Sequence, residues 1–198
     1  MQAARGTSLS RDDSSLDTTG PAASSARVRV LLVAVFAVLY AADQVTKHLA
    51  VEHLDGQPDR QLVGEILVLH LTRNPGAAFS TGVAYTELLS CVAIAAVLVV
   101  VWLSRRVRSP LWAVGFGFLL AGIAGNLTDR LLREPGPLRG HVVDFLMLPN
   151  WPVFNVADIC INVAAGLILV QAFRGIRLDG TPASQPASDE PDAPGDAP

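Results

Sequence analysis

The chain has 198 residues, of which 51% are hydrophobic and 17% are charged, and its formal net charge is −3. Soluble domains carry about 25% charged residues, so this composition disfavours an ordinary soluble protein. Both cysteines lie inside apolar runs, which leaves no disulfide framework to infer.

The two ends of the chain differ in composition from the rest. Residues 1–26 combine scattered charges with Ser, Thr, Ala and Gly, and the last twenty residues are mainly Pro, Ala, Ser and Asp. Segments so poor in apolar side chains cannot offset the entropy lost on ordering. We therefore predict disordered cytoplasmic tails at 1–26 and 175–198, on either side of one membrane domain at 27–174.

Four apolar stretches predict transmembrane helices. They cover residues 28–51, 85–103, 111–127 and 154–173, and each approaches the roughly 20 residues that a helix needs to cross a bilayer. The first could instead be a signal peptide, because Arg27 and Arg29 precede an apolar core of modest length. Three further spans and the polar cluster that follows favour a retained helix. The fold class is therefore a mainly α membrane protein.

The arginines predict the orientation of these spans. They flank the first span, fill the short loop after the second and follow the fourth, at Arg27, Arg29, Arg105, Arg106, Arg108, Arg174 and Arg177. Short cytoplasmic loops are enriched in Arg and Lys. We therefore expect both termini in the cytoplasm, and the loops 52–84 and 130–153 outside.

The first outer loop predicts β-structure. Residues 61–73 are rich in aliphatic and β-branched side chains, and the turn-forming triplet Asn74-Pro75-Gly76 closes them. We expect one or two strands on the membrane surface. They would form a small extracytoplasmic β-sheet cradle between helices 1 and 2.

Charged residues within the first span form an expected pair. Asp43 and Lys47 are four residues apart, so they share a helix face. Lys47 is the only lysine of the chain. It could be a lysine that snorkels to the interface with Asp43 as counter-ion, or the pair could brace an active site.

The third span carries small residues on one face and polar residues at its end. Ala113, Gly117, Ala121 and Gly125 recur every four positions, a spacing that favours close helix packing in lipid. Asn126 and Arg130 follow on one face. Packing requires neither of them, so they indicate a polar cluster at the outer surface.

Two aspartates, Asp144 and Asp158, flank the loop that leads into the fourth span. Carboxylates at a membrane boundary are functional candidates. Asn155 is the expected N-cap of the fourth helix, so Asp158 could also be a simple capping residue. Asn162, one turn deeper, could bond Asp158 or a neighbouring helix.

Metal, serine and cysteine catalysis lack their sequence signatures. The four histidines show no metalloprotease spacing, no Ser lies in a Gly-x-Ser-x-Gly elbow, and Cys160 lies deep in a span. Two close aspartates cannot easily both ionise, so one keeps a proton and the pair can act as base and acid. The helix N-terminus leads us to expect Asp158 as the charged member more often.

The chain closely resembles the bacterial lipoprotein signal peptidases (signal peptidase II), a family of four-helix membrane aspartic proteases. Five blocks carry the resemblance in the family's order: DQVTK (43–47), RNPGAAF (73–79), AGIAGNLTDR (121–130), VVDF (142–145) and FNVAD (154–158). Ala121 stands where a glycine is common, and both tails lie outside the resemblance.

The resemblance implies a role for each matching residue. Asp144 and Asp158 would be the catalytic dyad. The residues that bind substrate or support the dyad would be Asn74, Gly76, Asn126, Arg130 and Asn155. Those with a structural or supporting role would be Asp43, Lys47, Gly125 and Asp129.

The resemblance also implies the reaction. A monomeric enzyme of the cell membrane would cleave diacylglyceryl-modified prolipoproteins on the amino side of the lipidated cysteine, at the extracytoplasmic face. It would need no metal or organic cofactor, and its partners would be these substrates and membrane lipids, not nucleic acid. The alternatives are a small transporter with a polar path or an assembly factor. The charges collect at the outer ends of the spans, which disfavours a transport path.

Overall fold

The computed structural model describes residues 21–76 and 82–183, and the side chains from 25 to 76 and from 86 to 183. Most of both predicted tails lies outside these residues. Within them, helix α1 begins at Pro21, inside the predicted N-terminal tail. Residues 175–183 form a turn closed by a bridge between Ile176 and Pro182.

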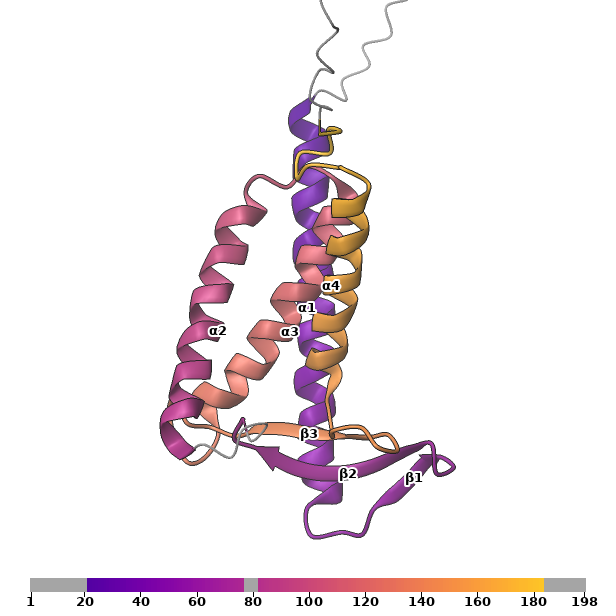
Figure 1. Ribbon diagram of the computed structural model, residues 1–198, viewed down its shortest axis with the longest axis vertical. Helices are drawn as coiled ribbons and strands as arrows, with labels where there is room; N and C mark the ends of the chain where they lie inside the picture. Colours follow the sequence, from indigo (N-terminus) through magenta and orange to yellow (C-terminus); the bar gives the residue numbers. More distant parts are fainter. Residues whose placement is uncertain (1–20, 77–81, 184–198) are drawn as a thin grey trace, which may run out of the picture.

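Four helices in the described part of the chain are long and apolar enough to cross a membrane, as the sequence predicts. They are α1 (Pro21–Leu54), α2 (Gly82–Ser104), α3 (Pro110–Leu132) and α4 (Val156–Phe173). Figure 1 shows them side by side, with the start of α1 and the end of α4 at one end of the bundle and the sheet at the other.

A three-stranded antiparallel sheet lies at the second end of the bundle (Figure 1). Strands β1 (Arg60–Val63) and β2 (Leu67–Asn74) confirm the strands predicted in the first outer loop. The third strand, β3 (Val142–Met147), pairs with β2 and comes from the loop between α3 and α4. The prediction of a sheet between helices 1 and 2 was therefore too narrow, because a further strand joins it from the loop between α3 and α4. Asp144 lies within this strand. The sequence pattern of β3 is too short to predict a strand by itself, because the strand forms by pairing with β2, which is distant in sequence.

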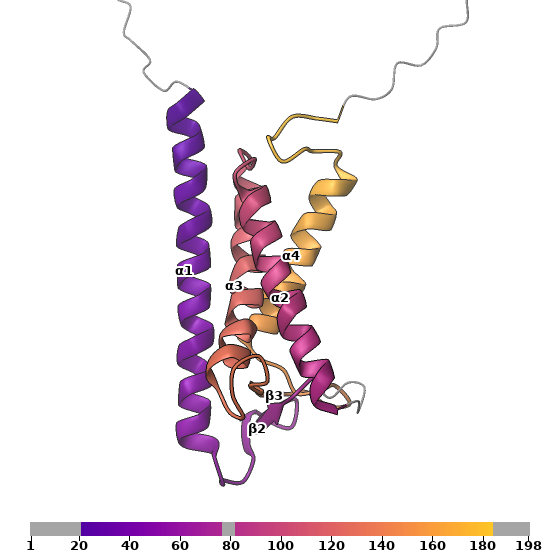
Figure 2. The same cartoon turned by 90° about the vertical axis from the view of Figure 1, so that its left-hand side faces the viewer.

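Helix α3 is the centre of the bundle, and α1 and α4 pack on different sides of it (Figure 2). Small residues allow these close approaches. A Cβ at Gly117 would lie 2.8 Å from Val35 of α1, and one at Gly125 would lie 2.5 Å from the Asp43 carboxylate. The predicted small-residue face of the third helix is therefore a packing face. Helix α2 packs mainly against α3.

Two apolar clusters stabilise the ends of the bundle. At the end of the bundle opposite the sheet, Trp112 and Phe116 pack with residues of α1, α2 and the segment after α4. Trp112 also donates its indole N–H to the Ile176 carbonyl (3.1 Å), which ties that segment to α3. At the other end, Val143 and Phe145 of β3 are buried against Ala50 and Leu54 of α1. This second cluster fixes the strand that carries Asp144.

The closest contact between α3 and α4 gives the first prediction. A Cβ at Gly122 would lie 2.5 Å from the Ala157 carbonyl oxygen, whereas one at Gly166 of α4 would meet nothing within 4 Å. We expect Gly122→Ala to push the helices apart and lower the free energy of unfolding by about 1–3 kcal/mol. The matched change Gly166→Ala should have no such cost. Thermal unfolding in detergent micelles measures both, and equal stability of the two variants would contradict this packing.

Candidate active site

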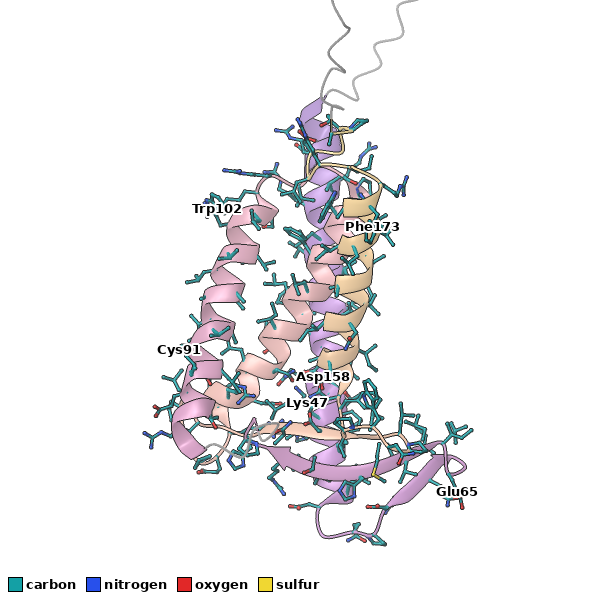
Figure 3. The ribbon with its side chains drawn as sticks, in the orientation of Figure 1. Lys47, Glu65, Cys91, Trp102, Asp158 and Phe173 are labelled. Carbon is teal, nitrogen blue, oxygen red and sulfur yellow. The ribbon has the colours of Figure 1, made fainter. Side chains whose placement is uncertain are left out.

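Asp144 and Asp158 lie where the helices meet the sheet. Asp144 is in the middle of β3 and is 2% exposed. Asp158 is in the first turn of α4, and Figure 3 shows it beside Lys47 at the end of the bundle that faces the sheet. The strand and the helix N-terminus thus bring together two carboxylates that are fourteen residues apart in sequence.

One asparagine contacts both aspartates. Asn155 caps α4, where its side chain accepts the Asp158 N–H (3.0 Å) and its own N–H bonds the Asp158 carboxylate (3.1 Å). Its Nδ2 donates to Asp144 Oδ1 (2.6 Å). Asp158 is therefore a capping residue, as one interpretation of the sequence held, but the cap also connects it to Asp144.

Two further asparagines complete the hydrogen bonds of the carboxylates. Asn126 Nδ2 donates to Asp158 Oδ1 and Asn74 Nδ2 donates to Asp144 Oδ2, both at 2.9 Å. Together with Asn155, they give each of the four carboxylate oxygens a neutral N–H donor. Neither aspartate forms an ion pair within 4 Å in the described residues.

The surroundings of Asp144 favour its protonated form. Burial raises its pKa from 3.8 to about 6, and the nearby Asp158 carboxylate acts in the same direction. The hydrogen bonds from Asn74 and Asn155 and the charge of Lys47 partly oppose this rise. Asp144 can therefore hold a proton at a pH where an ordinary aspartate is ionised.

Lys47 lies beneath this pair with a completely buried side chain. Its Nζ contacts Asp43 Oδ2 at 3.0 Å, Asp129 Oδ2 at 2.8 Å and Asn126 Oδ1 at 2.9 Å. An ammonium group has three N–H donors, so these three acceptors satisfy it fully. The expected pair with Asp43 is present. One of the two interpretations of the sequence, that Lys47 snorkels to the interface, is wrong because its side chain has no exposed surface.

The two carboxylates around Lys47 also bond the elements that carry the aspartates. Asp43 Oδ1 accepts the Ala157 N–H (2.9 Å) in the first turn of α4. Asp129 Oδ2 accepts the Val143 N–H (3.2 Å), which immediately precedes Asp144 in β3. The Lys47 cluster therefore connects α1 and α3 to both the helix and the strand that carry the candidate dyad.

Arg130 and Gly76 border the candidate dyad. Arg130 Nη1 is buried and has no hydrogen-bond partner among the described residues. A Cβ at Gly76 would lie 2.6 Å from Leu89 and 3.7 Å from Arg130 Nη2, and Gly76 has a φ of +100°. Only glycine suits both this conformation and this space. The rest of the RNPGAAF block, residues 77–79, lies outside the described residues.

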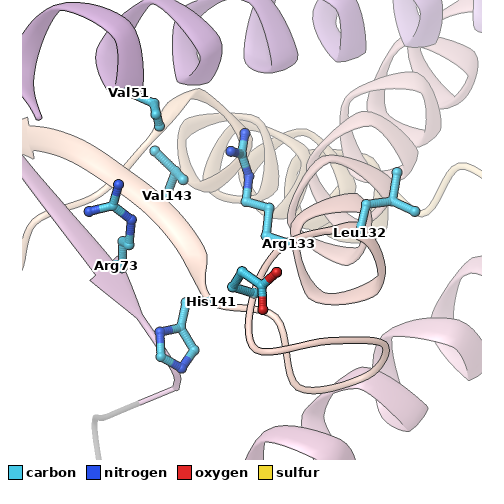
Figure 4. A pocket seen from close by; sticks show the side chains of 7 residues that line it. Val51, Arg73, Leu132, Arg133, His141 and Val143 are labelled. Atoms are coloured by element: carbon cyan, nitrogen blue, oxygen red, sulfur yellow. The ribbon is translucent and has the colours of Figure 1, made fainter.

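A pocket of about 300 Å³ lies beside the Lys47 cluster (Figure 4). Neither Asp144 nor Asp158 lines it. Arg73, Arg133 and His141 line it together with Glu134. Its arginines already have partners, because Arg133 bonds Asp129 and Arg73 bonds Asp55. In the described residues, no group of His, Cys, Asp and Glu is placed to hold a metal ion.

Comparison with known families identifies the family to which the chain belongs. The sequence model described as "Signal peptidase (SPase) II" matches residues 35–174. The chain belongs to the signal peptidase II family. It is thus a multi-pass membrane protein and an aspartic endopeptidase, and neither a transporter nor an assembly factor is supported.

Individual relatives agree with the family assignment. The lipoprotein signal peptidase of Mycolicibacterium smegmatis is 45% identical over 179 residues, covering 89% of this chain and 75% of the relative. That of Rhodococcus jostii is 44% identical and covers 86% of each chain. A solved bacterial membrane enzyme has a TM-score of 0.65 at 23% identity, covering 72% of this chain and 92% of its own, which shows a similar fold.

The structure brings the sequence candidates into one connected group. Eight of them share direct hydrogen bonds or ion pairs: Asp43, Lys47, Asn74, Asn126, Asp129, Asp144, Asn155 and Asp158. Gly125, Gly76 and Arg130 border the group. Sequence reasoning missed Gln44, which donates to Asp43 (2.9 Å), and Arg133, which bonds Asp129. The spacing of Asp129 and Arg133 by four residues was the available signal.

The buried Lys47 gives the second prediction. Replacing it in Lys47→Met leaves the buried Asp43 without a cation and Asp129 with Arg133 alone, which should lower the free energy of unfolding by about 3–5 kcal/mol. The matched variant Arg139→Met removes the cation of the exposed Arg139–Glu87 pair and should cost less than about 1 kcal/mol. Denaturation in detergent compares the two. A loss no larger for Lys47→Met would contradict the role of Lys47.

Proposed function

We propose that this protein removes signal peptides from diacylglyceryl-modified prolipoproteins, with Asp144 and Asp158 as its catalytic dyad. The observation that carries the proposal is the hydrogen bonding of the two carboxylates. Amide N–H groups bond all four oxygens, while the nearby Lys47 is bound by Asp43 and Asp129. Since neither aspartate forms an ion pair within the described part of the chain, no neighbouring cation holds both as anions, and the pair can share a proton.

The environments of the two aspartates support different roles. Burial and the Asp158 charge raise the pKa of Asp144 to about 6, so Asp144 is the proposed acid. Asp158 lies in the first turn of α4, where the helix dipole favours an anion, so it is the proposed base. The sharing of one proton is a property of the pair.

The reaction follows from these two roles. Asp158 takes a proton from a water molecule, whose oxygen bonds to the scissile carbonyl carbon, while Asp144 gives its proton to the carbonyl oxygen. Asp158 then passes its proton to the leaving nitrogen. As the C–N bond breaks, the hydroxyl proton of the intermediate returns to Asp144. The products are a free carboxyl group on the signal peptide and a free amino group on the lipidated cysteine.

The surroundings of the dyad support a lipid-anchored substrate. Asp158 begins a membrane-spanning helix and Asp144 lies in the adjoining sheet, so a scissile bond between them is at the edge of the membrane. Arg130 Nη1 has no hydrogen-bond partner among the described residues, so it can donate to a carbonyl oxygen of the substrate. The names of the relatives, lipoprotein signal peptidases, support prolipoproteins as the substrate class. All these groups come from one chain, so a monomer suffices.

Cleavage of a defined peptide tests the proposal. Purified protein should cut a diacylglyceryl-modified prolipoprotein peptide on the amino side of the modified cysteine and leave the unmodified peptide largely intact. Asp144→Asn and Asp158→Asn should each lower kcat by about 10²- to 10⁴-fold, because each removes an acid or base. Asp179→Asn, near the opposite end of the bundle, is the control and should cleave normally. Wild-type activity in either dyad variant would refute the assignment.

We also propose that both termini are cytoplasmic and that the sheet and dyad lie on the extracytoplasmic side. The arginines near the start of α1, between α2 and α3 and after α4 support this orientation. A fluorescent protein fused to the C-terminus should therefore fluoresce, and alkaline phosphatase inserted at Gly136 should be active. The opposite pattern would place the dyad in the cytoplasm and contradict the orientation.

A further inference from the structure

An apolar groove of about 430 Å³ lies between α1 and the sheet. Its walls include Leu49 and Leu54 of α1, Leu69 of β2 and Phe145 of β3, and the basic side chains Arg60 and His53 also line it. None of its lining residues is acidic. The groove therefore has a hydrophobic interior and two basic side chains, Arg60 and His53, in its lining.

The groove is separate from the dyad. Val143 and Phe145 pack into the apolar cluster with α1, and alternate residues of a strand point to opposite faces. Asp144, between them, bonds Asn74 and Asn155 on the other side. A molecule in the groove would thus pack behind the strand that carries Asp144, away from the scissile bond.

The basic side chains of the groove are available to a ligand. No acidic side chain pairs with Arg60 within the described part of the chain. His53 donates its Nδ1–H to the Leu49 carbonyl (3.0 Å), so its Nε2 can donate to a phosphate in the imidazolium form. The acids that flank the groove in sequence pair elsewhere: Glu52 with His48 (3.9 Å), Asp55 with Arg73 (3.0 Å) and Asp59 with His70 (2.7 Å).

The groove also lies at the membrane boundary. Its α1 residues belong to the last turns of the span Ser25–Leu54, and its other wall is the sheet that follows this span (Figure 1). Apolar walls at this depth meet acyl chains, and a cation just beyond them meets lipid phosphates. Leu49 is 46% exposed, so the groove opens sideways to lipid.

We propose that this groove binds one anionic phospholipid from the leaflet on the sheet side. One acyl chain lies along Leu49, Leu69 and Phe145, and the phosphate contacts Arg60, with His53 as a second contact. The net negative charge of the headgroup matches a site whose lining holds one permanent cation, Arg60, and no acid. The lipid is distinct from the substrate, whose reacting bond lies on the opposite face of β3.

Native mass spectrometry of the purified full-length chain tests the site. With added dioleoyl-phosphatidylglycerol, the wild type should retain one lipid, and with dioleoyl-phosphatidylcholine it should retain far less. Arg60→Gln should lower the retained fraction by about fivefold, since one basic residue near an anionic surface contributes about that factor. Arg139→Gln, an exposed arginine away from the groove, is the control. Equal losses in both variants, or equal retention of the two lipids, would overturn the proposal.

A second pair of variants tests the acyl chain. Leu49→Trp should fill the groove and reduce lipid retention, whereas Leu98→Trp, on the exposed face of α2, should not. Excess inorganic phosphate should not displace the phospholipid. Displacement by phosphate, or unchanged retention in Leu49→Trp, would show that the apolar groove does not hold the lipid.

Discussion

The buried charge of Lys47 is the constraint on which the rest of this structure depends. An ammonium group without water or partners is too costly within a membrane domain, so the chain must supply acceptors for all three N–H groups. Asp43, Asp129 and Asn126 supply them from α1 and α3. Because Asp43 also bonds α4 and Asp129 bonds β3, satisfying one lysine fixes the positions of four elements.

The same arrangement separates two kinds of carboxylate. Asp43 and Asp129 bond the cation and are held as a structural cluster, whereas amide N–H groups are the donors to Asp144 and Asp158 among the described residues. Asn126 joins the two groups, since its carbonyl oxygen accepts from Lys47 and its Nδ2 donates to Asp158. Lys47 therefore orients this amide toward the proposed base without forming an ion pair with it. Such an ion pair would hold the aspartate as an anion and oppose proton sharing.

Local patterns predicted much of this fold, and long-range pairing explains what they missed. The apolar spans, the face shared by Asp43 and Lys47 and the N-cap at Asn155 all depend on residues within a few positions of one another. Strand β3 depends on β2, about seventy residues away, so its six residues gave no clear signal. The contact of Lys47 with Asp129 and the groove behind Phe145 likewise require α1, α3 and the sheet to be assembled.

Infrared titration of the dyad tests whether Asp144 and Asp158 share a proton. Since the pKa of Asp144 is raised to about 6, the wild type should show a protonated carboxyl band that disappears as the pH rises from about 5 to about 7. The band should be missing in Asp144→Asn. It should persist in Asp158→Asn with a lower midpoint, because the neighbouring negative charge is gone. A band that persists in Asp144→Asn and is missing in Asp158→Asn would contradict the account.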